Sequence, residues 1–291
     1  EGLRPTPVFY APIEFGNMWH VCEEALASLD QTRINRSANY KWEADLTDYC
    51  RKMARKYPMQ QEQVDHWYNV VKTQFPHYVE CWRNHPDVVE RTPLFQEQTF
   101  DVRYALPSGR VVRLRGKCDS VDIIGKGKNA GIYLQENKTK SKIEELKLKR
   151  QLTFDLQTMT YLIALLGYKQ NAVNLGFPAA PILGVRYNVI RRDCPIRRHK
   201  ATKNKPEEGK AEFYRRLSDD YFAVEPEQWF MRWRSEVTVD DIDRFRRECL
   251  DPILEAMCYW YEYVTDRVKP QGPYATNMWN WRHPFGIRNI L

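Results

Sequence analysis

Three residues in the middle of the chain have the types and spacing of a metal-dependent hydrolytic site. Glu136 and Lys138 lie two positions apart in LQENKTK, and Asp119 follows Gly116 in GKCD. Alternate residues of a strand point to one face, so Glu136 and Lys138 project together, and pairing with the preceding strand would bring Asp119 near them. Two carboxylates suit a hard divalent cation, and a neighbouring ammonium counters negative charge that develops on a phosphate.

The surrounding sequence predicts the elements that must position these side chains. FQEQTFDVRYAL is strand-like, and RVVRLRGKCDSVDII and GIYLQENKTK predict two further strands separated by glycine-rich turns. A helix is expected over about 142–166, ending at Gly167, and AAPILGVRYNVI predicts a fourth strand. Residues 16–95 have apolar positions at helical spacing, interrupted at Pro76, and a long helix begins near Thr238. This order predicts an α/β fold, with a central mixed β-sheet flanked by helices.

Composition excludes several classes of protein. The 291 residues are 43% hydrophobic and 13% aromatic, which is enough for a substantial core and excludes wholesale disorder. No stretch has 18 uncharged apolar residues and no signal peptide is visible, so we expect no membrane contact and a cytoplasmic location. Seven scattered cysteines without a CxxC pair predict free thiols rather than a zinc site or a disulfide framework.

Positive charge is concentrated in one segment. Residues 191–216 contain ten Lys or Arg and four Asp or Glu, so this segment holds six of the chain's seven net positive charges. Such a stretch suits a polyanion, and Arg197, Arg198 and Lys200 are candidate DNA-binding residues. The alternative is a solvated loop without a partner. Pro195, Pro206 and Gly209 break any regular pattern, so we expect a mobile loop.

The residues alone leave two acidic positions open. Asp122 lies three positions after Asp119 and is either an acid at a strand end or the ligand in place of Asp119. Glu97, in the first strand, is either a further acid in the site or, as the pattern favours, an exposed strand residue. GKGKNAG precedes a strand and lacks the glycine spacing of a phosphate-binding loop, so it predicts a hairpin turn.

Together these pieces resemble the PD-(D/E)XK nuclease superfamily, in particular its RecB-like branch of phage and bacterial exonucleases. Four ordered motifs within roughly residues 14–190 carry the resemblance: Gly16-xxx-His20, Gly116-xx-Asp119, Glu136-x-Lys138 and Gln157-xxx-Tyr161. The resemblance implies a restriction-endonuclease-like core in a single nuclease domain over 1–291. Within it, 1–95 would be a mainly helical region carrying His20, 96–190 the catalytic sheet core, and 191–291 the basic loop and C-terminal helices.

The resemblance also implies a role for each motif residue. His20, Asp119, Glu136 and the backbone carbonyl of Asn137 would bind Mg²⁺ or Mn²⁺, and the family pattern favours Asp119 over Asp122. Lys138 would position or activate the attacking water. Gln157 and Tyr161, one helical turn apart, would contact the DNA backbone or brace the site.

The implied function is metal-dependent hydrolysis of DNA, as an exonuclease acting on linear duplex or single-stranded ends in recombination or repair. The alternatives are a catalytically inactive nucleic-acid-binding protein on the same fold and a restriction-type endonuclease. Some relatives bind an iron–sulfur cluster, but the closing region TNMWNWRHPFGIRNIL lacks the cysteines, so we expect no cluster from this chain. The missing start Met and the absence of the N-terminal piece that the resemblance leads us to expect ahead of GLRP predict a trimmed chain. The resemblance places the protein in a bacterial or phage-infected cell and allows a homo-oligomer or a recombination partner protein.

Overall fold

The computed structural model describes residues 7–27, 38–172, 178–203 and 206–267. The chain divides into two compact units, which are described separately below. The first consists of residues up to Val102 together with Arg115–Thr238, and the second of Arg103–Leu114 together with the residues from Val239 onward. The prediction of a single nuclease domain over 1–291 stays a prediction.

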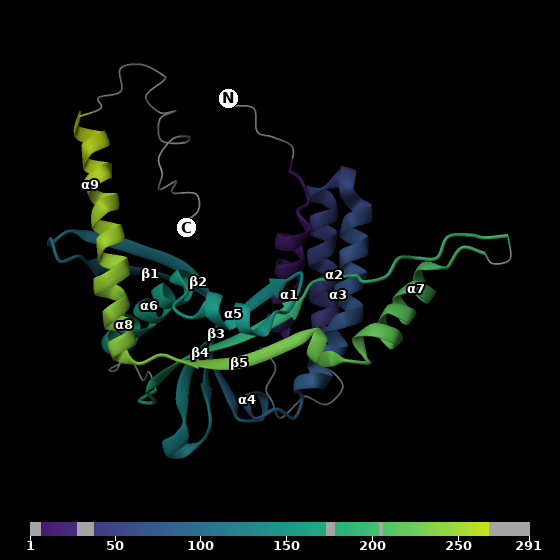
Figure 1. Cartoon of the computed structure of the whole chain (residues 1–291), viewed down its shortest axis with the longest axis horizontal. Helices are drawn as coiled ribbons and strands as arrows, with labels where there is room; N and C mark the ends of the chain where they lie inside the picture. The colour runs from purple at the N-terminus through teal and green to yellow at the C-terminus, as the bar shows by residue number, and fades with distance from the viewer. Residues whose placement is uncertain (1–6, 28–37, 173–177, 204–205, 268–291) are drawn as a thin grey trace. The chain divides into compact units, whose positions relative to one another are not determined.

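The N-terminal part of the first unit is helical, as predicted. It contains α1 (Ala11–Ala27), α2 (Ala38–Lys56), a 3₁₀ turn (Pro58–Gln60), α3 (Gln61–Trp82) and the short α4 (Pro86–Val89). Helices α1, α2 and α3 lie side by side and contact one another (Figure 1). The expected interruption at Pro76 is wrong: Pro76 is exposed, while Phe75 and Tyr78 are buried and hold the helix in place on both sides of it.

Aromatic packing between these helices fixes the rotation of α1. Trp19 is fully buried, and its ring centroid lies 5.2 Å from those of both Phe75 and Tyr78 on α3. Fully burying a large apolar side chain contributes about 1.5–3 kcal/mol, so α1 cannot rotate without a substantial loss of stability. Consecutive helical residues point about 100° apart. Burial of Trp19 therefore determines where the next residue, His20, points.

Five strands form a mixed sheet in the order β1-β2-β3-β4-β5. β2 pairs antiparallel with β3, β3 parallel with β4, and β4 antiparallel with β5, which confirms the predicted α/β class. The bounds of the strands are β1 (Arg91–Ala105), β2 (Val111–Ile124), β3 (Gly131–Lys140), β4 (Ile182–Arg191) and β5 (Phe230–Glu236).

Strand β3 lies at the centre of the sheet and is covered on both faces. Every residue from Gly131 to Asn137 is buried, which is the pattern of a strand with packing on both sides. Helix α1 contacts β3, and α6 contacts both β3 and β4. The parallel β3–β4 connection runs through α5 and α6, as a parallel crossover requires. Glu136 and Lys138 thus extend from the most constrained strand of the unit.

The single helix expected over 142–166 is two helices. α5 (Glu145–Leu152) ends before Phe154, whose φ of 55° lies in the left-handed region. α6 (Leu156–Ala172) begins where the Asp155 carboxylate accepts hydrogen bonds from the backbone N–H and the hydroxyl of Thr158, at 3.2 and 3.0 Å. This is an N-terminal cap, and it restarts the helix. The expected end at Gly167 is wrong, since α6 continues to Ala172.

The part of the first unit after β4 contains two elements that were not predicted. The first is α7 (Lys210–Leu217), which lies largely inside the segment expected to be a loop. It is followed by a short π-helix (Ser218–Phe222) and a 3₁₀ turn (Pro226–Gln228), and the second unpredicted element is β5. β5 pairs with β4 beside Gly184, whose φ is 142°. A Cβ at Gly184 would lie 2.1 Å from the backbone oxygen of Ser235, so only glycine allows this close approach.

The second unit contains the tip of the β1–β2 hairpin and the C-terminal helices. The segment expected to form one long helix consists of α8 (Val239–Phe245), a short π-helix (Arg246–Leu250) and α9 (Asp251–Arg267). The Tyr104 hydroxyl donates to Asp251 at 2.5 Å, and Arg110 pairs with Glu255 and Glu262 at 3.0 and 2.8 Å. Across the part of the chain that the structure describes, no helix has the length and apolarity needed to cross a membrane.

Candidate active site

The register of the central strands separates the two candidate aspartates. Ser120 of β2 pairs with Gln135 of β3, so Asp119 and Glu136 are the next positions along the two strands and share a face of the sheet. Asp122 is three residues from Asp119, and an odd separation along a strand places it on the opposite face. The geometry therefore groups Asp119, and not Asp122, with Glu136.

Asp122 has a structural environment of its own. It is fully buried and pairs with Arg186 at 2.8 Å and with Arg91 at 2.9 Å, and it also accepts a hydrogen bond from Ser120. A buried carboxylate is stable only when it is paired in this way. Asp122 therefore holds two buried or largely buried arginines in place within the sheet.

His20 and Asp119 meet as predicted, and a third residue joins them. His20 Nδ1 lies 3.1 Å from Glu97 Oε1 and 3.6 Å from Asp119 Oδ1. One ligand atom from each of these three residues lies within 4.8 Å of the others, so they could hold a metal ion together. They come from α1 and from the two strands of the β1–β2 hairpin, and α1 lies far from that hairpin in sequence.

Glu97 is the site residue that the sequence analysis did not favour. Its φ of 49° is an uncommon backbone conformation for a non-glycine residue and interrupts the regular geometry of β1. Strained positions of this kind cluster at functional sites. The carboxylate is held by His20 and by Lys117 Nζ at 2.5 Å. Strand periodicity could not reveal this, because the local conformation departs from a regular strand.

Glu136, Asn137 and Lys138 surround this group from β3. Lys138 Nζ donates to Glu136 Oε1 at 2.6 Å, and the backbone N–H of Asn137 donates to Asp119 Oδ2 at 2.7 Å. The other oxygen of Glu136, Oε2, is buried and has no hydrogen-bond partner among the described residues. Glu136 does not belong to the group of His20, Glu97 and Asp119 whose ligand atoms lie within 4.8 Å of one another. Its charge nevertheless raises the pKa of His20, and Asp119 and Glu136 repel each other.

The pKa values of these residues show that negative charge is concentrated in the candidate site. Burial, and then the charge of Asp119, raise the pKa of Glu136 to about 7, and burial also raises the pKa of Asp119. Burial opposes the charged form of His20, but the hydrogen bond to Glu97 and the charges of Asp119 and Glu136 outweigh it and raise the pKa of His20 to about 9. The site therefore favours a positive charge among the carboxylates.

Helix α6 adds the other two predicted residues. Gln157 Oε1 accepts a hydrogen bond from Lys138 Nζ at 2.9 Å, and Gln157 Nε2 donates to the Tyr161 hydroxyl at 3.0 Å. A Cβ at Gly116 would lie 2.8 Å from the Tyr161 ring, so the glycine of the GKCD motif makes room for this side chain. In the structure, Gln157 and Tyr161 brace the lysine. DNA contact by these two residues stays a prediction.

The basic segment has more structure than expected. Arg197, Arg198 and Lys200 are exposed, within residues 192–203. This segment is fixed to α7 through Glu208, which is 7% exposed, accepts the His199 backbone N–H at 2.8 Å and pairs with Arg216 at 2.7 Å. DNA contact by the three basic residues stays a prediction.

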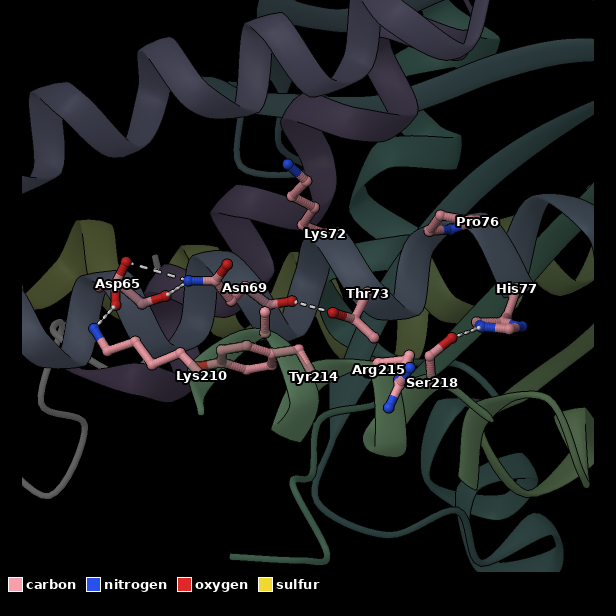
Figure 2. Close-up of a pocket in the computed structure, with 11 residues that line it drawn as sticks. Asp65, Asn69, Lys72, Thr73, Pro76, His77, Lys210, Tyr214, Arg215 and Ser218 are labelled. Carbon is pink, nitrogen blue, oxygen red and sulfur yellow. Dashed lines mark hydrogen bonds and ion pairs between the residues drawn. The ribbon is translucent and has the colours of Figure 1, made fainter. Parts of the chain in front are cut away.

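A groove of about 580 Å³ separates α7 from α3, but it contains none of the predicted site residues. Figure 2 shows its polar lining, in which Lys210 pairs with Asp65 at 2.8 Å and His77 shares a hydrogen bond with Ser218 at 2.8 Å. These contacts join α7 to α3. They hold α7, at the C-terminal end of the basic segment, in place. The groove is not the candidate active site.

The residues present fit a divalent cation. Carboxylate oxygens and an imidazole nitrogen converge here. The buried Oε2 of Glu136 lacks a hydrogen-bond partner among the described residues. The pKa values of Asp119 and Glu136 are raised, which shows that both carboxylates need a nearby positive charge to stay ionised. The mixed sheet flanked by helices, with two acids and a lysine on one sheet face, defines a restriction-endonuclease-like α/β protein.

Comparison with known proteins gives the family. The family model of the PD-(D/E)XK nuclease superfamily matches residues 1–254, and the chain belongs to this superfamily. The RecB-like branch is consistent with this match. Membership implies a nuclease that acts on nucleic acid with divalent metal ions, usually Mg²⁺. No curated protein matches the chain.

Proposed function

We propose that this protein is a Mg²⁺- or Mn²⁺-dependent deoxyribonuclease that degrades DNA from its ends, in recombination or repair. The observation that carries the proposal is the convergence of His20, Asp119 and Glu136 from three separate elements beside Lys138. An inactive DNA-binding protein on the same fold would not need buried carboxylates that repel one another beside a lysine. The cytoplasmic location, a homo-oligomer and a recombination partner stay predictions.

His20, Asp119, Glu136 and the backbone carbonyl of Asn137 would hold the divalent ion, with Glu97 as an additional acidic ligand. When bound, the ion supplies Lewis-acid chemistry at the scissile phosphate. His20 must lose its proton to act as a ligand, so ion binding and the proton on His20 compete for the same carboxylates.

Lys138 would orient or activate the attacking water. In the described contacts, two of its three N–H groups are used, by Glu136 Oε1 at 2.6 Å and by Gln157 Oε1 at 2.9 Å. The remaining N–H can orient a water, and the ammonium charge offsets the negative charge that develops on the phosphate. Gln157 and Tyr161 keep the ammonium in this position.

The proposal is tested by incubating the full chain with linear and closed circular duplex DNA of one sequence, with Mg²⁺, Mn²⁺ or a chelator. We expect metal-dependent loss of the linear DNA only, no product from Glu136→Ala, and full activity from Glu144→Ala, which removes an exposed acid next to α5. Retention of both DNAs without cutting would favour the inactive binder. Discrete fragments from the circle would instead favour a restriction-type endonuclease.

The exposed basic residues Arg197, Arg198 and Lys200 should contribute to affinity without contributing to the chemistry. Replacing all three with alanine is expected to reduce the slope of log K against log salt, by about 0.9 for each phosphate that the protein no longer neutralises. Binding to a fluorescent duplex in the presence of a chelator measures this slope. The matched control removes three cations of α2, Arg51, Lys52 and Arg55; equal slopes for the two triple variants would make the segment a bystander.

A further inference from the structure

A chain of buried hydrogen bonds lies behind the site, on the face of the sheet opposite Asp119 and Glu136. Asn137, the central residue of the Glu136-x-Lys138 motif, accepts a hydrogen bond on Oδ1 from Asn188 Nδ2 of β4 at 2.9 Å. The second hydrogen of that amide goes to the hydroxyl of Tyr78 on α3, at 2.7 Å. Asn188 is fully buried, and Tyr78 is 3% exposed.

The Tyr78 hydroxyl accepts two hydrogen bonds at this point. Besides Asn188, it accepts a hydrogen bond from Arg232 Nη2 at 2.8 Å, so both of its acceptor positions are occupied. Burial, and then the charge of the nearby Glu23, raise the pKa of Tyr78, so its hydroxyl stays protonated. Glu23 lies on α1, three residues after His20, and is itself buried.

The ring of Tyr78 forms a second connection to the same helix. It packs edge-on against Trp19, with ring centroids 5.2 Å apart, and Trp19 precedes His20 in α1. One residue of α3 therefore contacts both halves of the site. Its ring packs against the helix that carries His20, and its hydroxyl reaches, through Asn188, the strand that carries Glu136 and Lys138.

We propose that Tyr78 is a positioning residue that sets the placement of His20 on α1 relative to Asp119, Glu136 and the Asn137 carbonyl. Its ring packs against Trp19 of α1, and its hydroxyl accepts a hydrogen bond from Asn188, which also binds Asn137. This inference rests on the proposed function. Metal sites depend on the partners that orient their ligands, and loss of such a partner typically costs about 10–100-fold in metal affinity or activity.

Tyr78→Phe tests the proposal, because it keeps the ring against Trp19 and removes only the hydroxyl. The matched control is Tyr57→Phe: Tyr57 is 4% exposed, and its hydroxyl donates to buried Glu14 at 2.5 Å in the same group of helices, away from the site residues. Each variant loses a buried hydroxyl together with its hydrogen bonds, so both should be destabilised.

The readouts are Mn²⁺ affinity by calorimetry and the kcat and KM for linear duplex DNA. We expect about tenfold weaker Mn²⁺ binding and lower kcat with unchanged KM for Tyr78→Phe, and no change for Tyr57→Phe. Asn188→Leu, which breaks the next connection and keeps a similar side-chain shape, should reproduce the effect.

Two outcomes would overturn the proposal in different ways. If the wild type binds Mn²⁺ and Tyr78→Phe binds it equally well with the same kcat, Tyr78 has only a structural role and the proposed nuclease function still stands. If the wild type binds no Mn²⁺ and cuts no DNA, the proposed function fails, and the positioning role fails with it.

Discussion

Lys138→Ala is expected to lower the rate of DNA cleavage by at least about 10³-fold, as expected for loss of a group that stabilises charge only in the transition state. The ammonium donates to Glu136 and Gln157, and the Lys138 side chain is 19% exposed, so solvent reaches it. It is not a metal ligand, and affinity for Mn²⁺ should therefore stay nearly unchanged. Single-turnover cleavage and calorimetric Mn²⁺ titration measure the two quantities separately.

The control for this variant is Lys128→Ala, which removes an exposed lysine from the turn between β2 and β3. It should cut DNA at the wild-type rate. Wild-type cleavage by Lys138→Ala would remove Lys138 from the mechanism. Loss of Mn²⁺ binding in Lys138→Ala would show that the lysine acts through the placement of Glu136 rather than on the reaction.

Asp119→Asn is expected to abolish stabilisation of the protein by Mn²⁺. An ion at 100 times its Kd stabilises the folded state by about 2.7 kcal/mol, which corresponds to a rise in Tm of roughly 5 °C or more for a chain of this size. The amide of asparagine can still accept the Asn137 backbone N–H, but it lacks the charge that the ion requires. Without metal, the Tm of the variant should be no lower than that of the wild type, because a buried charge close to Glu136 is removed.

Thermal unfolding with and without Mn²⁺ measures both effects. Asp101→Asn serves as the control, since it neutralises an exposed acid on β1 and should keep the full metal-induced rise in Tm. Glu97→Gln should reduce the rise without abolishing it if Glu97 is an additional ligand. A full rise in Asp119→Asn would remove Asp119 from the metal site.

The sequence predicted the parts of the site that follow from strand and helix periodicity. The spacing of Glu136 and Lys138 placed them on one face, and the strand register that brings Asp119 beside them followed from a short hairpin. Glu97 could not be predicted, because its side chain is directed by a positive φ that no pattern of residue types reveals. The same holds for the break at Phe154, which splits one apolar helical pattern into α5 and α6.

Other differences arose where long-range contacts override local preference. Pro76 does not interrupt α3, because buried residues on both sides of it pack into the aromatic core. β5 contains two arginines, and both lie over aromatic rings, Arg232 on Trp82 at 4.5 Å and Arg234 on Tyr133 at 5.1 Å. Such partners are known only once the fold is known. The role of Tyr78, which depends on three other elements, was likewise not visible in the sequence.

We expect one divalent ion to bind between His20, Asp119 and Glu136. Anomalous diffraction from crystals of the full chain soaked in Mn²⁺ shows whether it does, with Asp119→Asn crystals as the reference. One strong anomalous peak should lie within ligand distance of the His20 imidazole and both carboxylates, and the variant should show none. The metal site would be disproved if crystals soaked in saturating Mn²⁺ kept the His20–Asp119 contact and gave no anomalous peak between these residues.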